Sequence, residues 1–392
     1  MRYKPPSSWQ KLAFKDAAEV ITGSTPSTKE PENYGEYLPF VTPGELDLGE
    51  PIIHAETSLS LVGKAKARTV PKDSVLVCCI GSLGKVGITG REVAFNQQIN
   101  ALVFNEKLVC PRYGYHYCRT LKPLLSHMAP STTVAIVNKS RFQSLEIPLP
   151  PLEEQRRIAA ILDKADGVRR KRKEAIRLTE ELLKSTFLEM FGDPVTNPKG
   201  WEICELQNVC NRVTDGTHQP PNWADEGIPF LFVSNIVNGE IDFKVSKHIT
   251  EESWFELTSR CPIEINDILY TTVGSYGNAA LVRTKNRFCF QRHIAHIKPD
   301  SRSIEPEFLL GMMQSDWIRQ QADKQARGVA QKTLNLRELK KFTIFTPPIE
   351  EQKKYVKLRQ GVEKQLSYYR SALEQSENLF NSLLQRAFRG EL

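Results

Sequence analysis

Two long stretches of the chain carry apolar residues at helical spacing. In the second stretch, apolar residues recur at intervals of three, four or seven, at Tyr355, Leu358, Val362, Leu366, Tyr369, Leu373, Phe380, Leu383 and Ala387. The first stretch has a similar stripe, at Ile158, Ile161, Leu162, Ala165, Val168, Ala175, Ile176, Leu182, Leu183 and Met190. Sustained spacing of this kind predicts one long helix packed along another as a coiled coil.

Each stretch opens with Pro-Pro and then Glu-Glu-Gln, which predicts helix starts near Leu152 and Ile349. Proline is tolerated in a first helical turn, and carboxylates there complement the helix dipole. A helix of about 39 residues is ~58 Å long, so it should bridge globular units. Two such helices packed antiparallel would create an approximate two-fold axis within one chain. We favour helix-start and domain-docking roles over partner contact for Glu153, Glu154, Gln155, Glu350, Glu351 and Gln352.

The segments before the two stretches contain short strand-like runs bounded by Gly, Pro and Asn. These runs are residues 37–41, 74–80, 99–104, 228–233, 267–273 and 294–298, and a helical stretch covers 305–321. Each segment is therefore predicted to be an α+β domain with a twisted, partly antiparallel sheet.

The chain also contains an internal repeat. Residues 147–191 and 344–388 are identical at 11 of 45 positions, where ordinary usage would give about three. Weaker matches at shifts of 192 to 195 pair Thr25 with Thr217, Gly81 with Gly274, and Phe95 with Phe290. The predicted order is a globular domain (1–150), a long helix (151–195), a second globular domain (196–347) and a second long helix (348–392). The divergence of the globular copies suggests that they recognise different things.

Composition narrows the class of protein only slightly. The 392 residues favour two or three domains, and 53 Lys and Arg against 46 Asp and Glu give a net charge of +7. No stretch is apolar enough to span a bilayer, and the first residues lack the apolar core of a secretory signal. We expect a cytoplasmic protein.

The cysteines show no metal-binding spacing. They are interpreted as core residues because zinc sites need ligands at short, turn-compatible intervals. His293 and His296 are three residues apart in a predicted strand, which directs them to opposite faces. No metal and no cofactor is predicted. The cysteines are Cys78, Cys79, Cys110, Cys118, Cys204, Cys210, Cys261 and Cys289.

Two glycine motifs superficially resemble phosphate loops. The first, IGSLGKVG at Ile80–Gly87, lacks the four-residue spacer and the Ser or Thr after lysine that such loops use, and its copy VGSYGNAA has no lysine. Both are interpreted as tight turns between strands with exposed tips. The catalytic motifs G-x-S-x-G, H-E-x-x-H and G-x-G-x-x-G are also missing, which favours a binding protein over an enzyme. The charge run Arg169–Lys173 is interpreted as a solvated or partner-facing patch, in preference to a phosphate contact.

The ordered set of motifs resembles the specificity subunits of type I restriction–modification systems over essentially the whole chain. The motifs that carry this resemblance are residues 21–28, 73–88, 95–103, 147–163, 267–281, 346–356 and 383–392. The second domain departs from the family pattern at FQRHIAHI (290–297) and DGTHQPP (215–221).

The resemblance implies a DNA-recognition subunit that is not itself an enzyme. In such systems each globular domain reads one half of a bipartite, asymmetric site in double-stranded DNA. The paired helices set the gap between the halves and dock two modification subunits, which bring the methyl donor and methylate adenine. ATP-dependent restriction subunits join some of these complexes.

Elementary physics gives a compatible picture. Two unlike readers related by a pseudo-dyad suit duplex DNA, whose equivalent grooves recur about every 34 Å. Affinity should come largely from Lys and Arg on phosphates, and base choice from a few side chains at groove edges. The candidate DNA contacts are Thr25, Lys64, Lys66, Arg68, Ser82, Lys85 and Arg91 in the first domain, and His218, Arg260, Tyr276, Asn278, Arg283, Lys285 and Arg287 in the second.

Two other hypotheses remain open at this point. One is a coiled-coil scaffold that joins protein partners without nucleic acid. The other is a nuclease or methyltransferase that acts alone on DNA. Salt-dependent binding to duplex DNA separates the first from a recognition subunit, and activity without any partner separates the second.

Overall fold

The computed structural model describes residues 6–129, 134–237, 239–328 and 332–392. Part of the N-terminal segment used in the expectation about a secretory signal, residues 1–5, lies outside these ranges. The chain divides into two compact units. The first unit comprises residues 1–177 and 368–392, and the second comprises residues 178–367. Each long helix therefore contributes one part to each unit.

The first unit contains a five-stranded sheet and a four-stranded sheet. The first has the order β2 (Ala18–Thr22), β10 (Ile99–Phe104), β7 (Val75–Cys78), β8 (Val86–Thr89) and β4 (Pro51–Ile52). The second has the order β5 (Thr57–Leu59), β3 (Tyr34–Val41), β9 (Val93–Phe95) and β6 (Thr69–Val70). Strands β1 (Gln10–Ala13) and β11 (Glu146–Leu149) form a separate pair, and the helices are α1 (Phe14–Ala17), α2 (Leu61–Lys66), α3 (Pro111–Cys118), α4 (Lys122–Met128) and α5 (Lys139–Gln143).

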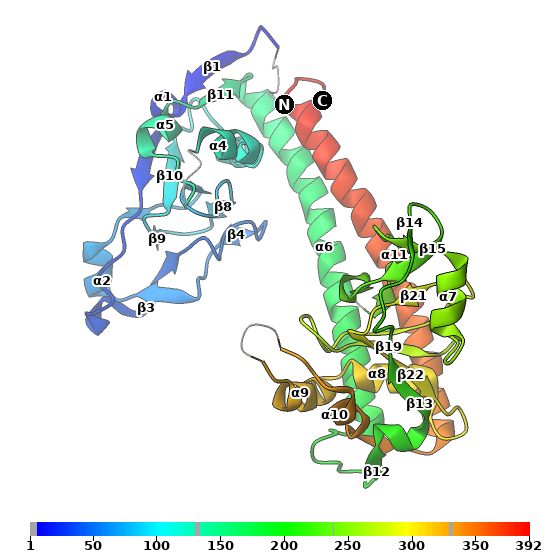
Figure 1. The fold of residues 1–392 in the computed structure, drawn as a ribbon. Coiled ribbons are helices and arrows are strands. Elements are labelled where there is room, and N and C mark those ends of the chain that lie inside the picture. The colour runs from blue at the N-terminus through cyan, green and yellow to red at the C-terminus, as the bar shows by residue number, and fades with distance from the viewer. Residues whose placement is uncertain (1–5, 130–133, 238, 329–331) are drawn as a thin grey trace. The chain divides into compact units, whose positions relative to one another are not determined.

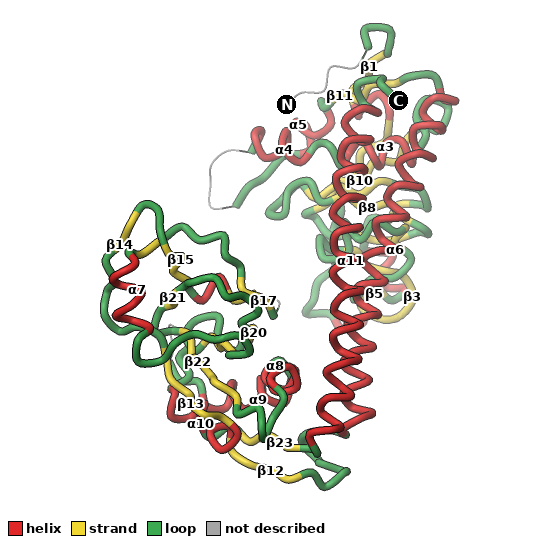
Figure 2. Tube along the Cα trace, turned by 90° about the vertical axis from the view of Figure 1, so that its right-hand side faces the viewer, coloured by secondary structure: helices red, strands yellow, loops and turns green. Residues whose placement is uncertain are grey.

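The second unit repeats this arrangement. One sheet has the order β13 (Cys210–Asp215), β22 (Ile294–Pro299), β19 (Ile268–Thr271) and β20 (Ala279–Leu281). The other has the order β14 (Trp223–Ala224), β18 (His248–Ile249), β15 (Ile228–Leu231) and β21 (Cys289–Phe290). The remaining elements are the pairs β12 (Glu202–Glu205) with β23 (Thr343–Thr346) and β16 (Ile236–Val237) with β17 (Glu240–Ile241), and helices α7 (Glu251–Thr258), α8 (Pro306–Met313), α9 (Asp316–Gln325) and α10 (Leu336–Lys340). Figure 2 shows α10 beside β13.

Corresponding elements follow one another in the same order in both units. The two copies of the strand pair begin at Gln10 and Glu202, and the helices that follow the main sheets begin at Pro111 and Pro306. The predicted duplication and the mixture of helices and sheets are therefore confirmed. The main sheets differ in one respect: β4 extends the first sheet, whereas four strands make up the described second sheet.

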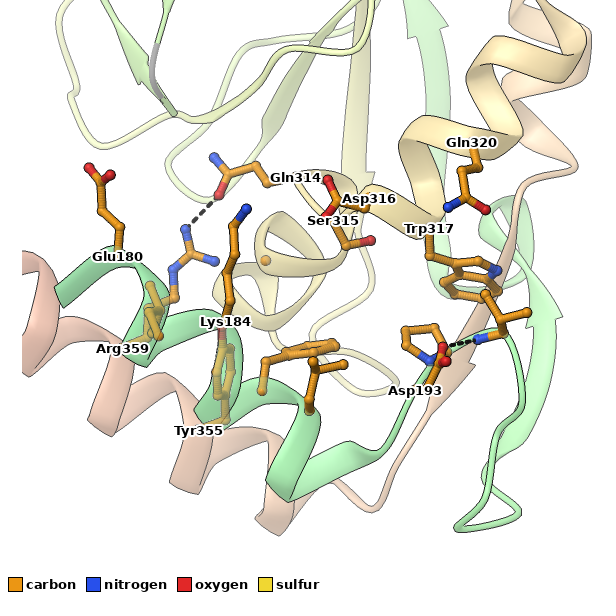
Figure 3. A pocket seen from close by; sticks show the side chains of 16 residues that line it. Glu180, Lys184, Asp193, Gln314, Ser315, Asp316, Trp317, Gln320, Tyr355 and Arg359 are labelled. Atoms are coloured by element: carbon orange, nitrogen blue, oxygen red, sulfur yellow. Dashed lines mark hydrogen bonds between the residues drawn. The ribbon is translucent and has the colours of Figure 1, made fainter. Parts of the chain in front are cut away.

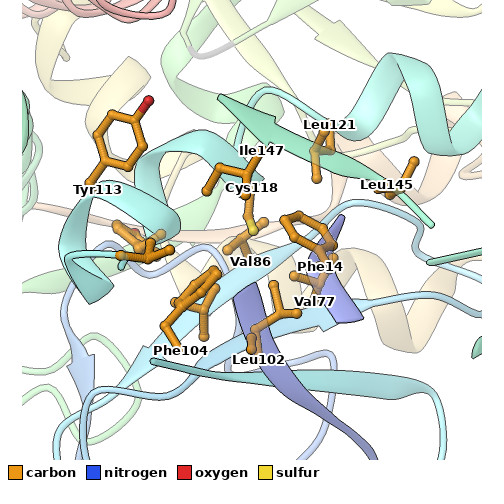
Figure 4. Packing of buried hydrophobic residues seen from close by; sticks show 14 of the residues in the cluster. Phe14, Val77, Val86, Leu102, Phe104, Tyr113, Cys118, Leu121, Leu145 and Ile147 are labelled. Atoms are coloured by element: carbon orange, nitrogen blue, oxygen red, sulfur yellow. The ribbon is translucent and has the colours of Figure 1, made fainter. Parts of the chain in front are cut away.

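The core of the first unit lies between the main sheet and α3. Alternate residues of the strands, such as Val77 and Leu102, face Phe14 from α1 and the buried side of α3 (Figure 4). Gly114 on α3 approaches the ring of Phe104 so closely that a Cβ atom would lie 2.3 Å from it. Glycine is therefore required at this helix position, because a larger residue would separate the helix from the sheet.

The long helices are α6 (Leu152–Phe191) and α11 (Ile349–Ala387), and both begin at the predicted residues. In the first unit, Arg157 on α6 donates to the carbonyl oxygen of Leu392, and Lys173 pairs with Glu377 at 3.0 Å. Rising numbers on one helix meet falling numbers on the other, so the helices run antiparallel. In the second unit, the rings of Phe187 and Tyr355 pack at 5.4 Å. Figure 1 shows the two helices side by side.

A buried glutamine docks each helix start onto its domain. Gln155 donates from Nε2 to the carbonyls of Leu108 and Pro150 and accepts the backbone N–H of Cys110, which precedes α3. In the second unit, Gln352 accepts the N–H of Glu305, which precedes α8, and donates to the carbonyl of Pro347. Both glutamines are at most 1% exposed. The predicted docking role is confirmed for these two residues.

The interpretation of Arg169–Lys173 as a solvated or partner-facing patch does not hold for its three arginines, which bind groups within the first unit. Arg169 pairs with the buried Asp166 at 2.7 Å and stacks on Phe380 at 5.0 Å. Arg170 pairs with Glu50, and Arg172 donates to Ser376. These residues fall on helix faces that contact the rest of the unit, and a run of charges in the sequence does not indicate which face each residue occupies.

The contacts between helix and domain carry different charge patterns in the two units. In the first, Arg112 and His116 of α3 bind Asp163 of α6, and Arg119 binds Asp166. In the second, Arg359 of α11 donates to Gln314 (Figure 3) and lies 4.0 Å from Glu307 of α8, while Arg283 pairs with Glu363 of α11 at 3.3 Å. A cavity of about 520 Å³ lies beside Arg359. Figure 3 shows Lys184, Trp317 and Tyr355 in its wall.

Candidate nucleic-acid interface

The loops that carry several candidate residues leave one end of each main sheet. In the first unit, the register pairs Asn100 with Thr22, Ile99 with Cys78, and Val77 with Val86. The end of β2, the start of β10, the end of β7 and the start of β8 are therefore adjacent. We call this end, with the loops 23–30, 79–85 and 96–98, the first reading end.

A close backbone approach shapes the first reading end. A Cβ atom at Gly23 would lie 2.1 Å from the carbonyl oxygen of Asn96, so only glycine fits where the loop after β2 passes the loop before β10. Thr25 then donates from its hydroxyl to Gln97. Arg68 donates to the carbonyl of Thr22 at 2.8 Å. Two predicted DNA contacts, Thr25 and Arg68, thus lie together with the side-chain amide of Gln97, which was not among the candidates.

The first glycine motif forms the tight turn that was predicted between β7 and β8. Gly81 and Gly84 have φ values of 74° and 76°, in the left-handed region that favours glycine. Beside the turn lies a cavity of about 410 Å³, lined in part by Ser82, Lys85 and Lys122. Lys85 donates to the carbonyl of Pro43 at 3.1 Å. Two ammonium groups and a hydroxyl at this turn match the chemistry of phosphate contacts.

The second unit has the same close backbone approach and the same kind of glycine turn, which we call the shared frame, with different side chains. A Cβ atom at Gly216 would lie 2.4 Å from the carbonyl oxygen of Phe290, and Arg292 donates its backbone N–H to Thr217 at 3.1 Å. The turn at Gly274 and Gly277 again has positive φ values. We call this end, with the loops 216–222, 272–278, 291–293 and 332–335, the second reading end.

Not all first-unit candidates lie at the reading end. Lys64 and Lys66 are on or beside α2 and pair with Glu92 and Glu30 at 2.7 and 2.6 Å. Arg91 follows β8 and is exposed at the opposite end of the main sheet. The structure therefore groups Thr25, Arg68, Ser82 and Lys85, and separates Arg91 from them.

The second-unit candidates are more dispersed. His218 and Asn278 lie at the second reading end, whereas the loop after β20 carries Arg283, Lys285 and Arg287 at the opposite end of the sheet. Arg283 pairs with Glu307, and Arg287 pairs with Glu251 and stacks on Trp254 at 4.8 Å. Arg260 is exposed, and its carbonyl accepts a bond from Arg212. The structure therefore places these candidates in different parts of the second unit.

Tyr276 differs from the expected exposed turn tip. Its side chain is 5% exposed, its hydroxyl donates to Asp323 at 2.6 Å, and Arg319 stacks on its ring at 4.7 Å. Both partners come from α9, which lies far along the sequence. The ring of Tyr276 therefore packs beneath the turn, and Asn278 and Ser275 provide the accessible polar groups of the turn.

The structure adds residues that the sequence analysis missed. Gln97 and Gln98 in the first unit correspond to Arg292 and His293 in the second, because β10 and β22 begin directly after them. The change from FNQQ to FQRH was visible as a departure from the family pattern. Burial lowers the pKa of His293, and the positive charges of Arg292 and His218 lower it further.

A Cys–His–Asp arrangement in the second unit has a structural role. His296 lies 2.6 Å from Asp267 and 3.4 Å from the sulfur of Cys261, and Lys298 donates to the same carboxylate at 2.9 Å. Burial raises the pKa of the Cys261 thiol, so the nucleophilic thiolate is disfavoured. The arrangement satisfies buried polar groups beneath the sheet.

The cysteines are free thiols, and four of them are buried. Burial raises the pKa of Cys79 and of Cys210 to about 12. In the described ranges, no group of three or more His, Cys, Asp or Glu side chains has the arrangement of a metal site. No described helix is both long enough and apolar enough to cross a membrane.

A repeated α+β frame with two differently equipped ends, joined to long paired helices, defines a two-domain recognition protein. The chain belongs to the family described as "Type I restriction modification DNA specificity domain", whose profile matches residues 6–178 and 198–368.

Curated relatives extend this match over the full chain. It is 26% identical to the type I restriction enzyme EcoBI specificity subunit of Escherichia coli, over 98% of this chain and 86% of that protein. It is 24% identical to the MjaIX specificity subunit of Methanocaldococcus jannaschii, over 99% and 94%. The fold is similar to that of the S subunit of a type I system from M. genitalium, with a TM-score of 0.58 and 15% identity over 99% of this chain and 98% of that one.

Proposed function

We propose that this chain is the DNA-specificity subunit of a type I restriction–modification complex. Each unit reads one half of an asymmetric, bipartite site in double-stranded DNA, and the domain division is the one expected from the repeat. The observation that carries this proposal is the pair of reading ends. Both have the same glycine-shaped frame, but one presents threonine and amides and the other presents histidines and arginine. Different side chains at equivalent loops of a shared frame are what reading two different half-sites requires.

The chain acts by binding, and methyl transfer belongs to modification subunits. The long helices provide surfaces for such partners, because several of their apolar side chains are exposed. Leu182 and Leu188 on α6 are 58% and 50% exposed, and Leu358 and Leu379 on α11 are 51% and 57% exposed. Exposed apolar residues repeated along a helix are typical of a protein interface. The relatives' specificity-subunit names and this helix surface support modification subunits as partners, and ATP-dependent restriction subunits as further ones.

The test is the binding of the purified full chain to a duplex of about 40 base pairs, measured by fluorescence anisotropy between 50 and 200 mM salt. We expect binding that weakens steeply as salt rises, since phosphate contacts release counterions, and that strengthens when the modification subunits are added. A helical scaffold without DNA affinity would show no binding at any salt concentration. Methylation by the chain alone, without any partner, would contradict the division of labour proposed here.

A further inference from the structure

Three basic side chains converge at the second reading end. Arg292 and His293 follow β21, and the Nε–H of Arg292 donates to Nε2 of His293 at 3.3 Å. His218 comes from the loop after β13 and reaches the same place, because the backbone N–H of Arg292 donates to Thr217. We call Arg292, His293 and His218 the basic triplet.

The backbone holds these loops together. Thr272 donates both its N–H and its hydroxyl to the carbonyl of His293, at 2.9 and 3.0 Å. Gly274 donates its N–H to the carbonyl of Lys332, whose side chain is exposed. Hydrogen bonds among four loops therefore hold the backbone that carries the triplet in place.

The charges of the triplet are incompletely balanced. Within the triplet, His218 has an acidic partner in Asp215, at 2.8 Å. His293 faces Arg292 on its own loop and His218 on the neighbouring loop. Burial lowers the pKa of His293 most, and the positive charges of Arg292 and His218 lower it further. Groups of like charge held close together favour a bound anion, which relieves the repulsion and accepts their N–H groups.

The first reading end lacks this chemistry at the corresponding positions. Gln97 accepts from Thr25, and Gln98 accepts from Asn96 at 2.9 Å, so these amides are paired and uncharged. The two ends therefore differ in charge where their frames are the same.

We propose that the basic triplet is a binding site for a DNA backbone phosphate, present only in the second unit, and that its hold on DNA requires protonated histidine. This proposal rests on the proposed DNA-binding function. Protonation of His293 converts Nε2 from the acceptor of the Arg292 N–H into a donor to the phosphate, so binding is accompanied by proton uptake. Affinity then increases as the pH falls through the pKa of His293 in the bound state, and decreases at higher pH.

The test uses the full chain with its modification subunits and a duplex that carries its methylated motif. Affinity is measured at pH 6.0 and 8.0 and at several salt concentrations. The main variant, Arg292→Gln with His293→Gln, introduces the two glutamines of the first reading end. A second variant, His218→Asn, retains a polar partner for Asp215. The control variant, Gln97→Ala with Gln98→Ala, alters the matching loop of the first unit.

We expect the unmodified complex to bind about tenfold more weakly at pH 8.0 than at pH 6.0. The glutamine variant should lose most of this pH dependence, and the slope of log affinity against log salt should decrease by about 0.9 for the lost phosphate. The His218 variant should lose part of it, and the control should retain all of it. An equal pH dependence in the glutamine variant would overturn the phosphate site while leaving DNA binding intact. Absence of DNA binding at both pH values would overturn the proposed function and this inference together.

Discussion

The contacts between helix and domain are alike in their hydrogen bonds and different in their charges. Gln155 and Gln352 make the same bonds, 197 residues apart, to the residue that precedes α3 or α8. Around them, the first unit places arginines on the domain and aspartates on the helix. The second unit has one pair of this polarity, Arg283 with Glu363, and one reversed pair, with Glu307 on the domain and Arg359 on the helix. The shared bonds define the architecture of the repeat. The reversed pair makes each helix segment fit its own domain, because the wrong pairing would bring like charges together.

The largest effect should come from the buried carboxylate of the first unit. Asp166 is 1% exposed and pairs with Arg119, Arg169 and Arg170, so Asp166→Asn leaves these guanidinium groups poorly compensated, at a cost of about 3–5 kcal/mol. Its counterpart in the repeat is Glu363, whose side chain is 32% exposed. Glu363→Gln should cost less than about 1 kcal/mol. Hydrogen exchange in each unit measures both, and equal costs would refute the asymmetry.

The glutamine contacts should be equally important in the two units. Gln155→Leu and Gln352→Leu each leave a buried backbone N–H and carbonyl groups without partners, at a cost of about 1–3 kcal/mol. Glu153→Gln and Glu350→Gln, at matching exposed positions, are the control pair. Local hydrogen exchange should show a similar loss of protection at α3 and at α8. A loss of protection at only one of these two helices would mean that the two glutamines do not contribute equally to their units.

Acid should weaken the first unit at a site that the second unit lacks. Burial alone would raise the pKa of Asp163, but hydrogen bonds from His116 and Arg112 outweigh it and lower this pKa to about 2. The folded-state pKa lies below the ordinary value of 3.8, so the stabilisation is present above about pH 4 and is lost as the pH falls toward 2. Because Asp163 is partly exposed, we expect about 1 kcal/mol.

Asp163→Asn is the variant that isolates this contribution. Its stability should depend less on pH between 4 and 2 than that of the unmodified chain, as followed by local hydrogen exchange in the first unit. The position equivalent to Asp163 in the second unit is Gln360, which has no charge to titrate. If the stability of the Asp163→Asn variant and that of the unmodified chain depended on pH in the same way, Asp163 would not be the source of the acid sensitivity.

The smallest effects should come from exchanging one turn residue between the reading ends. Lys85 lies at the position of Asn278 in the second glycine turn. Lys85→Asn should reduce the salt slope of DNA binding by about 0.9, and Asn278→Lys should increase it by a similar amount. Each change should alter stability by less than about 0.5 kcal/mol. Unchanged slopes in both variants would place DNA away from these turns.

Local patterns predicted much of the fold. The Pro-Pro-x-Glu-Glu-Gln starts predicted the first residues of α6 and α11, and the glycine motifs predicted the turns with positive φ. The repeat gave the duplicated architecture before any contact was known. These features depend on neighbouring residues in the sequence, so periodicity and turn chemistry are sufficient to reveal them.

The rest depends on contacts between distant residues. Tyr276 is buried by Asp323 and Arg319, which lie on α9, and no local signal connects them. The arginines of the charge run were misassigned because their partners, Glu50 and Ser376, come from other elements. The reading ends required strand order: without it, Arg283 and Lys285 could not be separated from His218. Sequence gave the residue types, and topology decided which of them lie together.

The most direct test of the two-reader account is a single-molecule map of methylated adenines in cells with and without this gene. The account predicts a two-part motif that disappears on deletion. Replacing residues 1–146 with the matching domain of a relative should then change one half of the motif and leave the other half and its spacing unchanged. A motif that survives deletion, or an exchange that alters both halves together, would contradict the claim that each unit reads its own half-site.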